Sequence, residues 1–306
     1  MAAVSPTQAA RIAGQVLTAA ARSQTGTATA AADARDTAFT GAARRAAVAD
    51  ARLAAVAPQL SLSPPAVTGA QPGVLAVSQG PGYPRVIVVQ TTLKGSLYPM
   101  LYLLTEPRAG AGYKIAESAT LLPSATVHRF GPLSAGAAMP RSGAALTASV
   151  GTLLSTYAKA LSYPPVKVSN PPYRSGDRFA AQLLQNAALE AAQVKGQAAF
   201  TQQHRVLPGS TVTVGQADGG ALVFGALERT DAFAVKATQR LVPSPKLLAF
   251  EPKLKAATSS ARLVTLELLV FELPPGAGSS PTGTAGPAGT ARLVAASEHL
   301  VAGSGR

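Results

Sequence analysis

The chain has 306 residues, a net charge of +13 and no cysteine, which excludes disulfide bonds, thiol catalysis and cysteine-ligated zinc. No run of about 18 apolar residues is free of charges and turns, so the sequence predicts no transmembrane helix. The length suits two domains of roughly 150 residues each, and the positive charge favours anionic partners.

Residues 6–57 are expected to form helices. Ser5, Pro6 and Gln8 predict the first helix start, because a serine cap, a proline in the first turn and a glutamine three residues after the cap are typical of a capping box. Gly26 and Gly41 interrupt the helical pattern. We therefore expect three helices before the first strand.

The third of these helices, expected at residues 42–57, has a two-sided pattern. Its apolar stripe is predicted to face inward and its arginines to face outward. The stripe consists of Val48, Ala49, Leu53 and Val56, and the outer face carries Arg44, Arg45 and Arg52.

Strands dominate the rest of the first half, at residues 74–122. The runs are rich in β-branched and apolar residues and are separated by glycine and proline. They are expected at residues 74–79, 85–92, 97–105 and 113–122. Residues 123–144, rich in Gly, Pro, Ser and Ala, predict a linker with a domain boundary near Arg141.

The second half has the same order, with helices at residues 146–199 and strands at residues 200–301. The helices are expected at residues 146–161 and 176–199. The strands and shorter apolar pieces are expected at residues 200–207, 211–216, 221–229, 233–237, 247–250, 262–273 and 291–301. Residues 274–290 form a low-complexity insert that is expected to be flexible.

One hairpin occurs twice. Residues 100–122 and 268–301 each contain an apolar strand, a Pro/Gly turn and a second strand, with Lys-Ile-Ala-Glu-Ser in the first copy and Leu-Val-Ala-Ala-Ser in the second. A repeat with a period of about half the chain predicts two similar domains. We expect an α+β protein with domains at residues 1–140 and 141–306, each with N-terminal helices packed on its own curved antiparallel sheet.

Two resemblances extend this prediction. The end of the first hairpin, Tyr113-Lys114-Ile115-Ala116, resembles the corresponding ending of NTF2-like (cystatin-like) domains. The whole chain resembles a family of actinobacterial extracytoplasmic lipoproteins of unknown function, on the segments Phe-Thr-Gln at 200–202, Val-Leu-Pro-Gly-Ser at 206–210 and Ala-Asp-Gly-Gly-Ala-Leu-Val-Phe at 217–224. The resemblance implies tandem NTF2-like domains, export and a cell-envelope location, and it implies no activity.

The lipid-bearing cysteine of such lipoproteins is missing from this sequence. The expectation is therefore an extracytoplasmic, membrane-anchored protein whose signal peptide and lipidated cysteine are absent here, so that membrane contact comes only through that anchor. A cytoplasmic location is the alternative.

Histidines are the first candidates for catalysis, as general bases paired with an acid. His204 could meet Asp231 or Glu228 across the second sheet. His299 is next to Glu298, but neighbours in a strand point to opposite faces, so this pair cannot cooperate locally. His128 lies at the edge of the linker. No catalytic, cofactor-binding or metal-binding residues and no cofactor are therefore assigned.

A small-molecule enzyme of the isomerase or dehydratase kind remains an alternative, because some NTF2-like domains use an acid with Tyr or His. The candidate residues at the mouth of the second sheet are Tyr157, Tyr163, Tyr173 and Asp177. This alternative predicts a deep pocket that contains at least two of His204, Asp231, Tyr157 and Asp177.

The densest positive stretch predicts contacts with anions. Residues 236–255 contain a single acid, Glu251, and five cations: Lys236, Arg240, Lys246, Lys253 and Lys255. Nucleic acid is not expected as the partner, because the stretch lacks interleaved aromatic residues that would stack on bases.

Three functions follow from these observations. The preferred hypothesis is a non-enzymatic binding or scaffold module of the cell envelope, with an unknown protein or an anionic envelope polymer as partner. The small-molecule enzyme is one alternative, and electrostatic adhesion to anionic polymers or lipid headgroups is the other.

Overall fold

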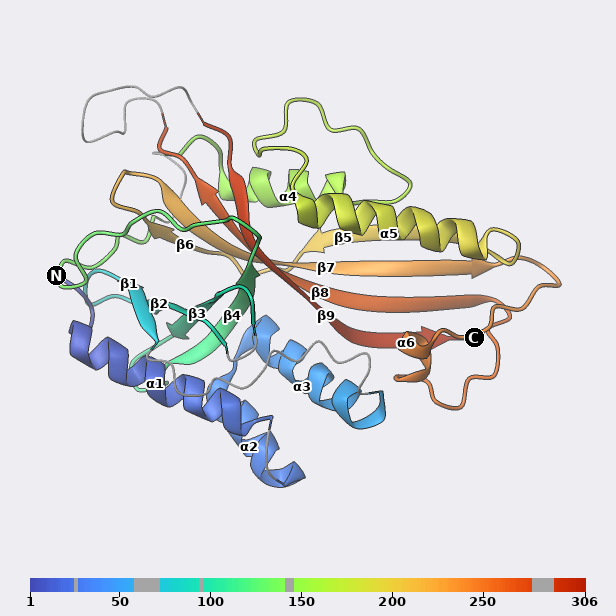
Figure 1. The fold of residues 1–306 in the computed structure, drawn as a ribbon, viewed down its shortest axis with the longest axis horizontal. Coiled ribbons are helices and arrows are strands. Elements are labelled where there is room, and N and C mark those ends of the chain that lie inside the picture. The colour runs from blue at the N-terminus through green and yellow to red at the C-terminus, as the bar shows by residue number, and fades with distance from the viewer. Residues whose placement is uncertain (25–26, 58–71, 94–95, 141–145, 277–288) are drawn as a thin grey trace.

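Helices precede strands in each half of the chain, as the sequence predicts. The computed structural model describes residues 1–24, 27–57, 72–93, 96–140, 146–276 and 289–306 (Figure 1). The expected domain boundary near Arg141 and most of the insert at 274–290 lie outside the described residues. Within the described part the protein is α+β, with helices on one open antiparallel sheet.

The first half contains three helices and four strands. The helices are α1 (Pro6–Arg22), α2 (Ala28–Ala38) and α3 (Gly41–Val56). The strands are β1 (Gly73–Val77), β2 (Arg85–Thr91), β3 (Met100–Glu106) and β4 (Lys114–Leu121). The capping prediction for α1 is confirmed, because Ser5 Oγ accepts a hydrogen bond from the backbone N–H of Gln8 at 3.2 Å.

The second half contains three helices and five strands within the described residues. The helices are α4 (Val150–Ala160), α5 (Arg178–Val194) and the short α6 (Pro245–Leu248). The strands are β5 (Ala198–Val206), β6 (Val212–Gly215), β7 (Ala221–Val235), β8 (Ser260–Leu273) and β9 (Arg292–Gly305). Two expectations were wrong. The break inside β7 is absent, because β7 pairs along its whole length with β8, and residues 247–250 belong to a helical turn and its end.

The repeated hairpin is present in both halves, as β3–β4 and β8–β9. In each copy the second strand has a β-bulge at its third residue: Ala116 lies between the paired residues Ile115 and Glu117, and Val294 occupies the same place in β9. The structural register therefore matches Lys114 with Arg292, one residue away from the match that the sequence suggested. A shared bulge position is a specific feature of a strand pair, so the repeat extends to backbone detail.

All nine strands belong to one sheet, which corrects the expectation of a separate sheet in each half. The order is β1-β2-β3-β4-β9-β8-β7-β5, with β6 also paired to β7. The second strands of the two hairpins pair with each other, but only at Thr120–Ala296 and Leu121–Ala295. A further bond runs from the N–H of Leu122 to the carbonyl of Val294 at 2.9 Å. The two hairpins thus share a short stretch of paired edge, and the rest of β4 and β9 is not paired between them.

Helix α3 packs against both β4 and β9 where these strands separate (Figure 1). The predicted inner face of this helix was right for Ala49 and Leu53 but wrong for Val48 and Val56, which are 48% and 59% exposed. The buried side instead consists of Ala43, Ala46, Ala49, Asp50 and Leu53. Small alanine side chains let the helix lie close to the two strands, and this tertiary contact overrides the periodicity of the larger residues.

A core shared by both halves lies on the other side of the first-half strands from α1. It combines Val86 and Leu103 of the first half with Leu222, Phe224 and Val270 of the second. Burial of apolar surface stabilises a protein by roughly 25 cal/mol per Å². Separating the two halves would therefore lose the stabilisation that this core provides. The halves are therefore joined by packing as well as by the β4–β9 pair.

One acid lies inside this shared core. Glu117 is 2% exposed and is paired across the hairpin with Leu103, so the two side chains share the core face. Neither carboxyl oxygen has a hydrogen-bond partner in the described structure. Burial raises the pKa of Glu117 well above its ordinary value, so folding favours the protonated form of this side chain.

Glu117 makes stability fall with rising pH. Because its folded-state pKa lies above the unfolded one, its contribution is fully present below the unfolded pKa of about 4.3 and is lost as the pH rises toward the folded pKa. Glu117→Gln removes this slope and is expected to stabilise the protein at pH 8 by at least about 1 kcal/mol. Urea unfolding at several pH values measures it.

The exposed acid Asp33 supplies the matched control, since Asp33→Asn removes the same charge from the surface of α2. The control is expected to follow the wild-type pH dependence. Parallel curves for Glu117→Gln and the wild type would contradict the assignment of a neutral, buried Glu117.

Candidate functional site

Four of the five predicted anion contacts lie together at one end of the long strands, and we call these four residues the basic tip. They are Lys236, Arg240, Lys253 and Lys255. The connection that carries them joins β7 to β8, whose pairing extends to Ala234 and Ser260. This end of the sheet lies at the right of Figure 1. The tertiary structure therefore brings cations from both ends of the connection to one place.

Buried apolar residues hold this connection to the sheet. Leu241 and Ala257 exchange two backbone hydrogen bonds of 2.9 Å. Both residues, with Leu247 of α6, are buried in the core under α5. Ser244 caps α6 by accepting a hydrogen bond from the N–H of Leu247 at 3.3 Å. The backbone of the tip is thus anchored to the core, whereas its charged side chains are exposed to solvent.

The cations of the basic tip are exposed and lack acidic partners. None of the four makes an ion pair within the described residues. Lys236 Nζ donates only to the backbone carbonyl of Lys195, at 2.5 Å. Two apolar residues of the same connection, Val242 and Leu248, are 74% and 37% exposed. Unpaired cations beside exposed apolar side chains suit contact with an anionic surface.

Lys246, the fifth predicted contact, lies apart from the basic tip. It lines a cavity of about 110 Å³ between α3, α6 and the strands, together with Asp50, Asp231 and Glu298. Burial raises the pKa of Glu190, and the positive charge of Lys246 opposes this rise. The positive charge of Lys246 is therefore already partly offset by the acids around it.

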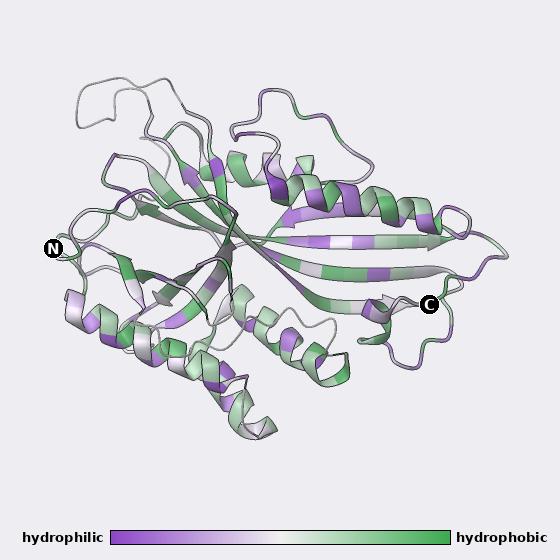
Figure 2. Cartoon of the chain, viewed as in Figure 1, coloured by the Kyte–Doolittle hydropathy of each residue, from purple (hydrophilic) through white to green (hydrophobic). Residues whose placement is uncertain are grey.

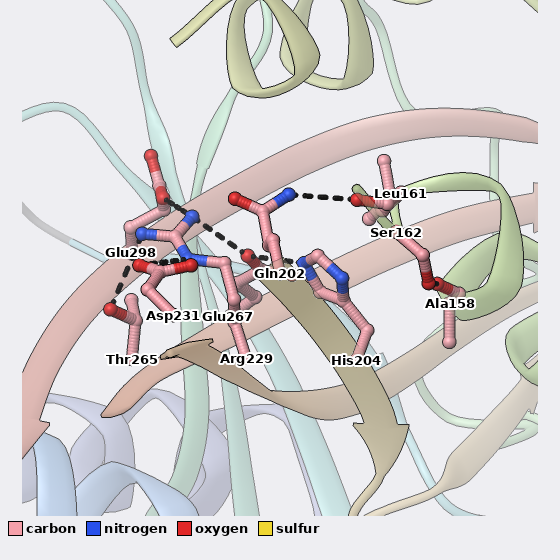
Figure 3. Close-up of polar contacts among 10 residues, drawn as sticks. All are labelled: Ala158, Leu161, Ser162, Gln202, His204, Arg229, Asp231, Thr265, Glu267 and Glu298. Carbon is pink, nitrogen blue, oxygen red and sulfur yellow. Dashed lines mark hydrogen bonds and ion pairs between the residues drawn. The ribbon is translucent and has the colours of Figure 1, made fainter. Parts of the chain in front are cut away.

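A cluster of charged side chains borders this cavity and continues into the interior of the protein (Figure 3). His204 of β5 and Glu267 of β8 are fully buried, with His204 Nε2 at 3.1 Å from Glu267 Oε1. Arg229 of β7 donates to the same oxygen, at 3.1 Å. Figure 2 shows the cluster as a hydrophilic stretch in the otherwise largely hydrophobic β7. One carboxylate oxygen thus joins side chains from three strands.

Arg229 organises the cluster. Its guanidinium also donates to Glu298, to Asp231 Oδ2 at 3.2 Å and to Thr265 Oγ1 at 3.3 Å. Burial acts to lower the pKa of Arg229, but the charges of its carboxylate neighbours outweigh burial and raise it. Burial likewise raises the pKa of Asp231, and the charge of Arg229 opposes that rise. Arg229 therefore remains charged and compensates several buried acids.

The cluster links strands of the sheet, and a substrate in solvent cannot reach its centre. His204 and Glu267 are each 0% exposed, so neither can reach a molecule in solvent. Sequence reasoning expected His204 to meet Asp231 or Glu228, and the structure pairs it with Glu267 instead. Arg229 and Glu267 were missed as functional candidates. The signal that could have found them is a charged residue at an inward position of an apolar strand.

Glu228 and His299 each contact a side chain from α3. Glu228 accepts hydrogen bonds from Arg205, at 2.6 Å, and from Arg45 of α3, at 3.0 Å. Burial raises the pKa of Glu228, but these two hydrogen bonds outweigh burial, so the pKa is lowered. His299 Nδ1 lies 2.8 Å from Asp50 Oδ2 of α3. The neighbouring Glu298 instead accepts a hydrogen bond from Arg229.

Tyr157 and Asp177, two residues of the enzyme alternative, contact each other. The Tyr157 hydroxyl lies 3.1 Å from both carboxylate oxygens of Asp177. Asp177 also caps α5 by accepting the N–H of Ala180 at 2.8 Å. Tyr173 packs edge-on against the buried ring of Tyr157, whereas Tyr163 contacts Phe200. These contacts stabilise the start of α5.

The predicted enzyme pocket is not assembled in the cavities near these residues. The cavity beside the charge cluster is lined by Asp231 without His204, Tyr157 or Asp177. A second cavity, at the start of α5, is lined by Asp177 without the other three. The geometry thus separates the four residues between two places.

Two searches of the described residues bear on other classes of site. Among those residues, no three His, Asp or Glu side chains form a group that could hold a metal ion. None of the described helices has the length and apolar character needed to span a membrane.

Comparison with known proteins identifies no relative: no family model, curated protein or solved structure matches the chain. Functional conclusions therefore rest on the geometry and chemistry described above.

Removal of Arg229 tests the role of the charge cluster. Arg229→Met leaves buried acids without their cation and is expected to lower the free energy of unfolding by about 3–5 kcal/mol. Arg229→Lys keeps the charge but loses the planar fork of donors, so an intermediate loss is expected. Urea unfolding at neutral pH measures both.

Arg262→Met on neighbouring β8 is the control, because Arg262 is exposed and its side chain donates only to Thr230, at 3.1 Å. This variant is expected to stay within about 0.5 kcal/mol of the wild type. A cost for Arg229→Met no larger than that of the control would disprove the proposed role of the cluster.

Proposed function

We propose that the protein is a non-enzymatic binding module of the cell envelope that contacts anionic polymers or lipid headgroups through its basic tip. The observation that carries this proposal is the group of exposed cations at one end of the sheet, none paired with an acid within the described residues. Clustered cations on one surface raise the local concentration of polyanions and their rate of association.

Anchoring of the tip supports binding over a merely solvated loop. Leu241 and Ala257 fix the connection to the core, so little backbone entropy is lost when a partner binds. Val242 and Leu248 add exposed apolar surface at the same end. A lipid headgroup region offers partners for both kinds of side chain.

The internal repeat supports a tandem architecture as part of this proposal. We infer two NTF2-like halves, each with its own hairpin and helices, joined through β4 and β9. Matching bulges at Ala116 and Val294 support common ancestry of the two hairpins. The resemblance to actinobacterial extracytoplasmic lipoproteins supports export and membrane anchoring in the native form.

Charge reversal at the tip tests the proposed function. Lys253→Glu/Lys255→Glu is expected to weaken binding to vesicles of phosphatidylglycerol and phosphatidylcholine, and to a phosphate-bearing polymer, by about tenfold or more. Binding by the wild type is expected to fall steeply between about 50 mM and 500 mM NaCl, because salt screens exposed charges. Co-sedimentation and fluorescence titration measure these effects.

The matched control is Lys159→Glu/Lys167→Glu, which changes the net charge equally at exposed positions outside the tip. It is expected to bind as the wild type does. Equal losses of binding in both double variants would show that net charge alone, and not the basic tip, determines binding. Binding that does not change with salt would rule out the electrostatic proposal.

A further inference from the structure

A cleft lined by arginines lies away from the basic tip, at the start of α5. It consists of two adjoining cavities of about 260 Å³ each, which share Arg174 and Arg292 in their walls. The first cavity is also lined by Arg178 and by Ser124, which follows β4. We call this feature the arginine cleft. Both halves of the chain contribute to its wall.

Arg292 is fixed in position at the start of β9. Its Nη2 donates to Glu272 Oε2 at 2.7 Å and to the backbone carbonyl of Thr126 at 2.9 Å. These two contacts hold the guanidinium on the wall shared by the two cavities. A ligand in the cleft would therefore meet an ordered cation.

Within the part of the chain that the structure describes, the guanidinium groups of Arg174 and Arg178 have no partner. Neither side chain makes a hydrogen bond, ion pair or ring contact with any described residue. Guanidinium groups remain charged at all physiological pH values. The first cavity therefore contains two guanidinium groups without an ion pair among the described residues, beside the ordered Arg292.

The cleft is also lined by three acids: Asp177 in the first cavity, and Asp218 and Glu272 in the second. Asp218 Oδ1 accepts a hydrogen bond from the N–H of Gly220 at 2.9 Å. Asp177 accepts hydrogen bonds from the Tyr157 hydroxyl at 3.1 Å and from the N–H of Ala180 at 2.8 Å. Glu272 accepts from Arg292 and from the backbone N–H of His128, the latter at 2.6 Å. The first cavity therefore has three arginines against the single carboxylate of Asp177 and keeps a net positive charge.

We propose that the arginine cleft binds the phosphate group of a small organic phosphate. Guanidinium groups match phosphate oxygens with two parallel hydrogen bonds, which gives arginine its preference for this anion. The first cavity of the cleft, at about 260 Å³, is below the usual size of a drug-sized site, and it suits the phosphate end of a phosphorylated sugar or alcohol or of a lipid headgroup. This inference does not depend on the basic tip.

Isothermal titration with glycerol 3-phosphate tests the cleft directly. The wild type is expected to bind it saturably, and Arg174→Gln/Arg178→Gln is expected to weaken binding by about tenfold or more. Arg292→Lys keeps a cation near Glu272 but loses the fork, so it is also expected to weaken binding. Circular dichroism confirms that each variant is folded.

Arg108→Gln is the matched control, because Arg108 is exposed in the β3–β4 turn, at the opposite end of β4 from Ser124. It is expected to bind glycerol 3-phosphate as the wild type does. The second arm compares vesicles with and without phosphatidylglycerol. If glycerol 3-phosphate does not bind, but binding to the phosphatidylglycerol vesicles requires Arg174 and Arg178, the phosphate belongs to a lipid headgroup.

The basic-tip variant separates the two proposals. Lys253→Glu/Lys255→Glu is expected to leave glycerol 3-phosphate binding unchanged even if it abolishes attachment to polymers or vesicles. The arginine cleft is refuted if neither glycerol 3-phosphate nor phosphatidylglycerol vesicles bind in a way that depends on Arg174 and Arg178, whatever the tip variant does.

Discussion

The structure depends on the place where β4 and β9 meet and then separate. Only two residue pairs join the strands there, and α3 packs against both strands where they part. Three polar contacts bind α3 to the second half: Arg45 with Glu228, Asp50 with His299, and Arg52 with the backbone carbonyl of Phe250 at 3.1 Å. Without α3, the short strand pair would expose backbone groups to water on both sides.

This junction joins the strands of both halves of the chain into one sheet, and charged side chains lie in the interior of that sheet. Arg229 links acids from its own and neighbouring strands, and its partner Glu267 binds His204 from the edge strand β5. Buried charges stabilise less than apolar residues of similar volume, but they penalise any register that separates them. The cluster therefore specifies strand alignment in the second half.

The candidate binding features lie at the two ends of α5, away from this interior. The arginine cleft borders the first turn of the helix, and the carbonyl of Lys195 at its other end accepts a hydrogen bond from Lys236 of the basic tip. A helix of 17 residues is about 25 Å long. Two binding sites this far apart can be occupied independently. A small anion could bind in the arginine cleft while an extended anionic surface contacts the basic tip.

The sequence by itself determined the local elements: the capped start of α1 at Ser5, the order of helices and strands, and the repeated hairpin. These depend on residues near one another in the chain, whose capping and periodicity are local properties. Only the tertiary structure decided that β4 pairs with β9, which face of α3 is buried, and that His204 meets Glu267. Each of these depends on segments far apart in sequence, because the partner across a sheet or beneath a helix is set by packing of the whole chain.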